Sequence, residues 1–118
     1  MVTEDGYHIT MFHLIADKPA TLNPVVFVHG LGGTAMSFMS TMKGLPLPCE
    51  LSNLGHDVYM PNNRGAMYSQ GHDTLDIHSK EYWQFDWSYF GKYETVTVVE
   101  TIRERRPDLG KAVLIGHS

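Results

Sequence analysis

The stretch Ala112-Val113-Leu114-Ile115-Gly116-His117-Ser118 runs from four apolar residues into a Gly-x-Ser sequence. An earlier stretch, Val25-Val26-Phe27-Val28-His29-Gly30, has the same form: a β-branched and aromatic run with a small-residue exit. Short continuous apolar runs are typical of parallel strands that are covered on both faces. We therefore predict two parallel strands, at 25–28 and 112–115, whose carboxyl ends carry the chemistry.

The rest of the pattern places these strands in an α/β fold. Residues 7–15 partly alternate after an Asp-Gly turn signal, which predicts a short antiparallel strand or one arm of a hairpin. Pro48 and Gly55 suit the first turn and the stop of a short helix over residues 49–54. Residues 57–61 predict another buried strand. Strands that alternate with helices imply a mostly parallel sheet with crossover helices.

The segment that begins at Ser88 carries two conflicting signals. Apolar residues recur near helical spacing as far as residue 102, and the charges Lys92, Glu94 and Glu100 lie mostly off that stripe. Residues 95–99 are β-branched and locally prefer a strand. Periodicity over about 15 residues outweighs a five-residue preference, so we expect a helix. The preceding residues, 66–87, look irregular.

Composition excludes several classes of protein. The formal charge is −4 and the nine Lys and Arg residues are scattered, which argues against a nucleic-acid partner. No apolar run approaches the roughly 18 residues of a membrane span. The first five residues are polar, so no signal peptide is expected in this chain. The single cysteine, Cys49, excludes an internal disulfide, and the oligomeric state stays open.

The two strand ends suggest acyl transfer. In open α/β sheets, sites form outside the carboxyl ends of the strands. Ser118 supplies the first half of the G-x-S-x-G nucleophile elbow, in which the serine occupies a strained turn after a strand. In such sites one oxyanion donor is a backbone N–H of the loop after an earlier strand. The glycine-rich turn around Leu31 suits that role, with Leu31 contributing its amide rather than its side chain.

Further motifs give the chain a resemblance to a known family. It resembles the acid lipases, the gastric and lysosomal acid lipase and steryl ester hydrolase family of the α/β-hydrolase superfamily. The matching pieces run in order along nearly the whole chain: Val2-Thr3-Glu4-Asp5-Gly6-Tyr7, Pro24-Val25-Val26-Phe27-Val28-His29-Gly30-Leu31, Gly55-His56-Asp57-Val58-Tyr59, Asn62-Asn63-Arg64-Gly65, Tyr82-Trp83-Gln84-Phe85-Asp86-Trp87 and Ile115-Gly116-His117-Ser118. The Asn-x-Arg-Gly and aromatic pieces are far more specific than Gly-x-Ser.

The resemblance implies a carboxylic ester hydrolase that acts on lipid esters, triglyceride or steryl ester, through a serine acyl-enzyme. It implies Ser118 as nucleophile, the Leu31 amide as an oxyanion donor, no cofactor or metal, and a secreted or lysosomal location. Residues 1–118 are expected to be the N-terminal part of a single domain, truncated at the nucleophile elbow. The triad acid and histidine would lie downstream, so we expect these 118 residues to be inactive alone. The alternative is a non-catalytic fragment or remnant.

Other polar residues receive less specific predictions. His117 is expected to point to the opposite face of its strand from Ser118. For His29 we expect a loop-anchoring role rather than a catalytic one. Arg64 is expected to hold its own loop by hydrogen bonds rather than to bind an anion. A solvated loop is expected, rather than a metal cluster, for four nearby side chains: His72, Asp73, Asp76 and His78.

The aromatic residues between 83 and 90 allow two readings. They are expected to pack a helix against the sheet, because aromatic side chains dominate protein cores. The alternative is a lipid-contacting or base-stacking surface. The set consists of Trp83, Phe85, Trp87, Tyr89 and Phe90.

Overall fold

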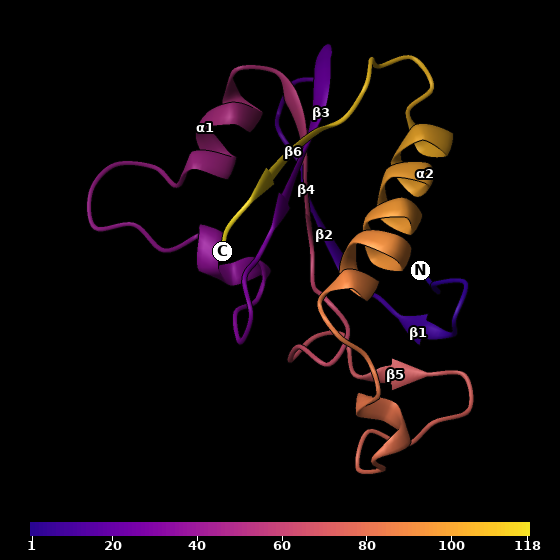
Figure 1. The fold of residues 1–118 in the computed structure, drawn as a ribbon. Helices are drawn as coiled ribbons and strands as arrows, with labels where there is room; N and C mark the ends of the chain where they lie inside the picture. Colours follow the sequence, from indigo (N-terminus) through magenta and orange to yellow (C-terminus); the bar gives the residue numbers. More distant parts are fainter.

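A four-stranded, mostly parallel sheet forms the centre of the molecule. In the computed structural model, which describes residues 1–118, the strand order is β2-β4-β3-β6. Strands β3 (Leu22–Val28), β4 (His56–Pro61) and β6 (Val113–Gly116) are parallel, and β2 (Met11–Leu14) pairs antiparallel with β4. Figure 1 shows these strands side by side. The α/β fold class, the parallel strands and the antiparallel first strand predicted from the sequence are confirmed.

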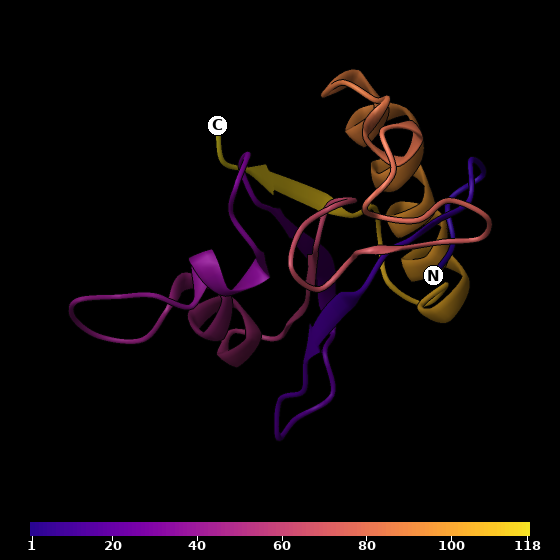
Figure 2. The same cartoon turned by 90° about the horizontal axis from the view of Figure 1, so that it is seen from below.

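Helices cover both faces of this sheet. The 3₁₀ helix η1 (Ala35–Phe38) and α1 (Leu47–Asn53) lie on one side, and α2 (Val96–Arg105) lies on the other, as the two views in Figures 1 and 2 agree. Alternation along β3 explains this division, because successive side chains of a strand point to opposite faces. The central strands β3 and β4 are therefore buried on both sides, as their continuous apolar runs predicted, whereas Val113 and Leu114 of β6 remain 48% and 47% exposed.

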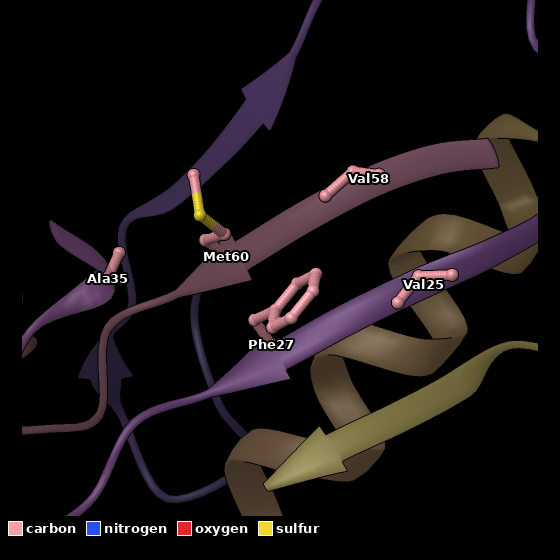
Figure 3. Packing of buried hydrophobic residues seen from close by; sticks show 5 residues of the cluster. All are labelled: Val25, Phe27, Ala35, Val58 and Met60. Atoms are coloured by element: carbon pink, nitrogen blue, oxygen red, sulfur yellow. The ribbon is translucent and has the colours of Figure 1, made fainter. Parts of the chain in front are cut away.

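Two separate apolar clusters fill the two layers. The cluster beneath η1 and α1 is drawn in Figure 3 and consists of Val25, Phe27, Ala35, Val58 and Met60. The cluster beneath α2 consists of Val26, Tyr59, Val98 and Ile102. All nine side chains are almost completely buried. Burial of a side chain of this kind contributes roughly 1.5–3 kcal/mol, so these clusters hold the strand ends in place.

The ambiguous segment after Ser88 is helical, as the periodicity predicted. A π-helical stretch, η3 (Phe90–Thr95), continues directly into α2. The wider π turn changes which residues face inward relative to a regular α-helix. Glu94 is consequently buried, with 2% exposure, although the α-helical pattern assigned it to the solvent side.

A second, small sheet packs at one end of the molecule. Residues 7–15 do not form one strand: β1 (Tyr7–His8) pairs with β5 (Gly71–His72), and β2 joins the main sheet. The turn at Gly6 has φ of +91° and supports a bridge between Val2 and His8. The predicted antiparallel pairing therefore exists, but it is divided between two sheets.

The aromatic segment packs mainly against this small sheet. Tyr82, in the 3₁₀ helix η2 (Glu81–Trp83), is fully buried with Tyr7 and Ile9, and Phe85 packs against this cluster. Trp87 is 81% exposed, so the expectation that all these aromatics pack a helix against the main sheet is wrong. None of the helices has both the length and the apolar character required to cross a bilayer.

Candidate active site at the ends of strands β3 and β6

The ends of β3 and β6 bring Ser118 against the loop after β3. Val28 pairs with Gly116 in the parallel register, and the His117 amide donates a 3.0 Å hydrogen bond to the Val28 carbonyl. A methyl group built on Gly30 would lie 2.8 Å from the Ser118 Cβ. The two strand ends are therefore in direct contact, and only a glycine at position 30 leaves room for Ser118.

Ser118 adopts an unusual backbone conformation. Its φ is +72°, and it is the one residue other than glycine with a positive φ in the chain. The left-handed region is unfavourable for a residue with a side chain and is concentrated at functional sites. A serine in such a conformation after a strand matches the nucleophile elbow.

His117 does not lie where strand alternation predicted. Its Nδ1 atom lies 3.0 Å from the same point beside Gly30 that Ser118 Cβ approaches. Strand β6 ends at Gly116, and the backbone turns at Ser118, so alternation no longer separates residues 117 and 118. The expectation that His117 points to the opposite face is therefore wrong.

The loop after β3 forms a tight turn with a free amide. The Gly33 amide donates a 3.0 Å hydrogen bond to the Gly30 carbonyl, and Gly32 has φ of +73°. The side chain of Leu31 is 93% exposed, and its amide donates to no backbone acceptor in the chain. The turn therefore leaves the Leu31 N–H without a backbone partner, one residue after the Gly30 that contacts Ser118.

His29 anchors this turn with both ring nitrogens. Its Nε2 accepts a 3.0 Å hydrogen bond from the Asn63 amide, which assigns the proton to Nδ1, 2.9 Å from the Gly30 carbonyl. The Asn63 side-chain amide also donates to the His29 carbonyl at 3.1 Å. His29 is buried and both of its nitrogens are engaged, so it serves as an anchor for the loop rather than as a base.

Comparison with known proteins identifies the family of the chain. The alpha/beta hydrolase fold family model matches residues 23–118, which include both strand ends. The chain belongs to this family. It is also a distant relative of the acid lipases: it is 31% identical to human lipase member J and 30% identical to bovine gastric triacylglycerol lipase, in each case over 100% of the chain. Human lysosomal acid lipase/cholesteryl ester hydrolase is 29% identical over 98% of the chain.

The match covers only part of these relatives. The chain spans 34% of lipase member J, 30% of the gastric lipase and 30% of the lysosomal lipase. Its 118 residues thus correspond to about a third of their length. The resemblance to acid lipases predicted from the sequence motifs is confirmed.

In this chain of the alpha/beta hydrolase fold family, Asn62 holds the segment that follows the Gly30–Gly33 turn. Its Oδ1 accepts a 2.9 Å hydrogen bond from the Ala35 amide at the start of η1, and its Nδ2 donates to the Thr10 carbonyl at 3.1 Å. The Ser69 hydroxyl donates to the Asn62 carbonyl at 2.8 Å. Asn62 is completely buried, so this side chain fixes η1 relative to the sheet.

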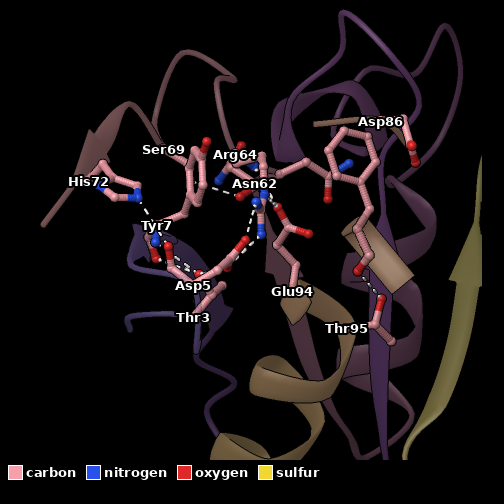
Figure 4. A network of polar contacts seen from close by, with 12 residues as sticks. Thr3, Asp5, Tyr7, Asn62, Arg64, Ser69, His72, Asp86, Glu94 and Thr95 are labelled. Atoms are coloured by element: carbon pink, nitrogen blue, oxygen red, sulfur yellow. Dashed lines mark hydrogen bonds and ion pairs between the residues drawn. The ribbon is translucent and has the colours of Figure 1, made fainter. Parts of the chain in front are cut away.

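Arg64 joins three parts of the chain that are distant in sequence. Its guanidinium donates to both Asp5 oxygens, at 2.6 and 3.0 Å, and its Nε donates to Glu94 Oε1 at 2.5 Å (Figure 4). The guanidinium carbon also lies 3.9 Å from the centre of the Tyr7 ring. These hydrogen bonds tie the loop that carries Arg64 to partners 59 and 30 residues away in the sequence.

The two carboxylates of this network are not equivalent. Burial raises the pKa of Glu94, and the hydrogen bond and charge of Arg64 offset only part of that effect. Burial acts in the same direction on Asp5, but hydrogen bonds from Arg64 and Thr3, together with the charge of Arg64, lower its pKa below the ordinary value. Glu94 Oε2 is buried and has no hydrogen-bond partner. The difference between the two carboxyl groups thus comes mainly from the deeper burial of Glu94.

The remaining predicted polar residues have structural contacts. His72 lies between the Asp5 carbonyl, 3.0 Å from its Nε2, and the amides of Thr74 and Leu75, which donate to its Nδ1. Asp73 pairs instead with His8, at 2.8 Å. No group of three histidine, cysteine or acidic side chains lies close enough together to hold a metal ion.

The sequence did not assign functions to Asn62 and Asn63. Each of these residues holds part of the segment that follows β3. In the sequence, however, α1 and β4 separate them from that segment. Turn-forming composition at 62–65 was the only local signal. The strength of the Asn-x-Arg-Gly resemblance was the feature that could have identified them as positioning residues.

Proposed function

We propose that this chain contributes the nucleophile and one oxyanion donor of a serine hydrolase that cleaves lipid esters. The observation that carries the proposal is the position of Ser118. It has a positive φ at the end of β6 and lies against Gly30, next to the free Leu31 amide. An acyl-transfer site needs a nucleophile and a hydrogen-bond donor to the oxyanion, and Ser118 and the Leu31 amide would supply these two parts.

The reaction would proceed through an acyl-enzyme. Ser118 Oγ attacks the carbonyl carbon of the ester and loses its proton to a base, while the carbonyl oxygen becomes an oxyanion. The Leu31 N–H donates a hydrogen bond to that oxygen as negative charge develops. The alcohol leaves after it receives the proton, and water then releases the acid from Ser118.

The substrate class follows from the relatives. One is a triacylglycerol lipase and another a cholesteryl ester hydrolase by name. We propose a lipid ester of one of these two kinds for the protein to which this chain corresponds.

The base and the orienting acid are proposed to come from outside residues 1–118, within the same domain. No side-chain hydrogen bond in the structure involves Ser118, and both nitrogens of His29 are engaged elsewhere. A serine hydroxyl without a base is a weak nucleophile. The 118-residue chain alone is therefore expected to be inactive, which keeps a non-catalytic role as the second candidate function.

A chimera tests the proposal. The corresponding first third of bovine gastric triacylglycerol lipase is replaced by this chain, and hydrolysis of a triacylglycerol emulsion is measured for the chimera and for its Ser118→Ala variant. The expected loss in the variant is about 10⁴-fold or more. Labelling of Ser118 by a fluorophosphonate is followed in parallel. A folded chimera that is not labelled at Ser118, or activity that survives Ser118→Ala, contradicts the proposal.

A further inference from the structure

The segment between η1 and α1, residues 40–46, extends away from the sheet, and we name it the 40–46 loop (Figures 1 and 2). Its first six residues are all exposed. Their hydrogen bonds are local: the Thr41 hydroxyl donates to the Lys43 carbonyl at 2.9 Å, and the Lys43 amide donates to Thr41 Oγ1 at 3.3 Å. Nothing else in the chain covers this loop.

Large apolar side chains project from the 40–46 loop and its junction with α1. Met42 is completely exposed, and Leu45 and Leu47 are each 53% exposed. None of them belongs to an apolar cluster of the interior. Exposed apolar side chains scattered singly are ordinary, whereas several within six residues on a projecting loop indicate a contact surface.

The charge of the 40–46 loop indicates the kind of partner that it would bind. Lys43 is the one charged residue between His29 and Glu50, in a chain with a formal charge of −4. A loop with apolar side chains, one cation and no carboxylate matches the boundary between lipid headgroups and acyl chains. There the apolar side chains leave water and the ammonium group reaches the phosphates.

We propose that the 40–46 loop docks the protein onto the surface of a lipid aggregate. This inference rests on the proposed function, because a lipid-ester hydrolase meets its substrate at such a surface. The loop follows η1, which begins directly after the Gly30–Gly33 turn beside Ser118. Along the chain, the 40–46 loop is therefore separated from the turn of the candidate site only by η1 and the residues that flank it.

Flotation with vesicles of ether-linked phosphatidylcholine tests the docking without any hydrolysis, so its result is independent of catalysis by Ser118. The monomer fraction of the 118-residue chain is used, with or without phosphatidylglycerol in the vesicles. The Met42→Asp/Leu45→Asp variant is expected to lower the partition coefficient about tenfold or more. Lys43→Ala is expected to cost about fivefold on the anionic vesicles alone.

Two matched variants control for nonspecific binding through exposed apolar side chains elsewhere on the surface. Ile15, 82% exposed in the loop after β2, and Trp87, 81% exposed in the aromatic segment, are each replaced by Asp. Both variants are expected to bind as the wild type does. Absence of wild-type binding, an equal loss in Ile15→Asp, or a loss confined to Trp87→Asp would each overturn the proposal. The substituted loop residues make no core contacts, so circular dichroism is expected to be unchanged in every variant.

Discussion

Gly30 and Ser118 are in such close contact that a methyl group on Gly30 would lie 2.8 Å from the Ser118 Cβ. Separations under about 3 Å between such carbons are strongly repulsive, so Gly30→Ala must displace either the turn after β3 or the end of β6. We expect the free energy of unfolding to fall by about 1–3 kcal/mol, the usual cost of overpacking.

Urea denaturation of the 118-residue chain measures this change. Gly116→Ala is the matched control, because a methyl group there meets nothing within 4 Å. The control is expected to alter stability by about 0.5 kcal/mol or less. Equal stabilities for the two variants would show that the Gly30–Ser118 contact is not maintained in solution.

The anchor made by His29 predicts a second outcome. His29→Ala removes the acceptor of the buried Asn63 amide and the donor to the Gly30 carbonyl. An unsatisfied buried donor costs about 1–3 kcal/mol. Hydrogen exchange at the Asn63 amide should accelerate, and His29→Gln, which retains an acceptor, should recover part of the protection. Unchanged exchange in His29→Ala would contradict the anchoring role.

The sequence predicted the sheet well because its strands carry their signal locally. The continuous apolar runs at 25–28 and 112–115 suffice to identify parallel strands, and small polar residues follow each run, but only the first of these strands is buried as predicted. The division of residues 7–15 between two sheets had no such signal. It depends on β5, a two-residue strand 63 positions after His8 in an otherwise irregular segment.

The long-range polar contacts of the structure could not be predicted from the sequence. Glu94 looked like a solvent-facing residue of an amphipathic helix, and only the π turn at 90–95 turns it inward. Arg64 and Asp5 are separated by 59 residues, and neither position is unusual in its own neighbourhood. Buried ion pairs of this kind are visible only when the fold brings their elements together.

Arg64 provides a third prediction. Its side chain is completely buried between Asp5 and Glu94. Arg64→Met leaves two carboxylates without their cation, and the removal of one partner of a buried pair costs about 3–5 kcal/mol. The same substitution in an Asp5→Asn/Glu94→Gln background is expected to cost much less. A double-mutant cycle in urea measures the difference, and simple additivity would contradict a coupled network.

The two carboxylates should respond to pH in opposite directions. The pKa of Glu94 is raised above 4.5 in the folded state, so its contribution to stability is full below about pH 4.5 and is lost as the pH rises through the folded value. The pKa of Asp5 is lowered below 3.8, so its contribution is present above that pH and is lost as the pH falls through the folded value.

The difference in unfolding free energy between the wild type and each variant, measured against pH, separates the contributions of Glu94 and Asp5. The stability of the wild type minus that of Glu94→Gln should decrease as the pH rises from 4 to 7, whereas the wild type minus Asp5→Asn should increase from pH 2 to 5. Thermal unfolding across this range provides both curves at once. Two curves that change with pH in the same direction would contradict the opposite pKa shifts of Glu94 and Asp5.

The edge of the main sheet leads to a prediction about association. Strand β6 pairs only with β3, and its residues Val113 and Leu114 are 48% and 47% exposed. An unpaired strand with exposed apolar side chains is a template for pairing with another chain. We expect the 118-residue chain to self-associate at micromolar concentrations and Leu114→Lys to suppress this, because a charge on an edge strand opposes pairing.

Sedimentation velocity over a concentration series measures the association. The Met42→Asp/Leu45→Asp variant is the control, since the 40–46 loop lies apart from β6 and its substitution should leave the sedimentation coefficients unchanged. If that variant dissociates the assembly while Leu114→Lys does not, the loop and not the β6 edge forms the contact. A wild type that stays monomeric throughout the series would contradict the predicted association through β6.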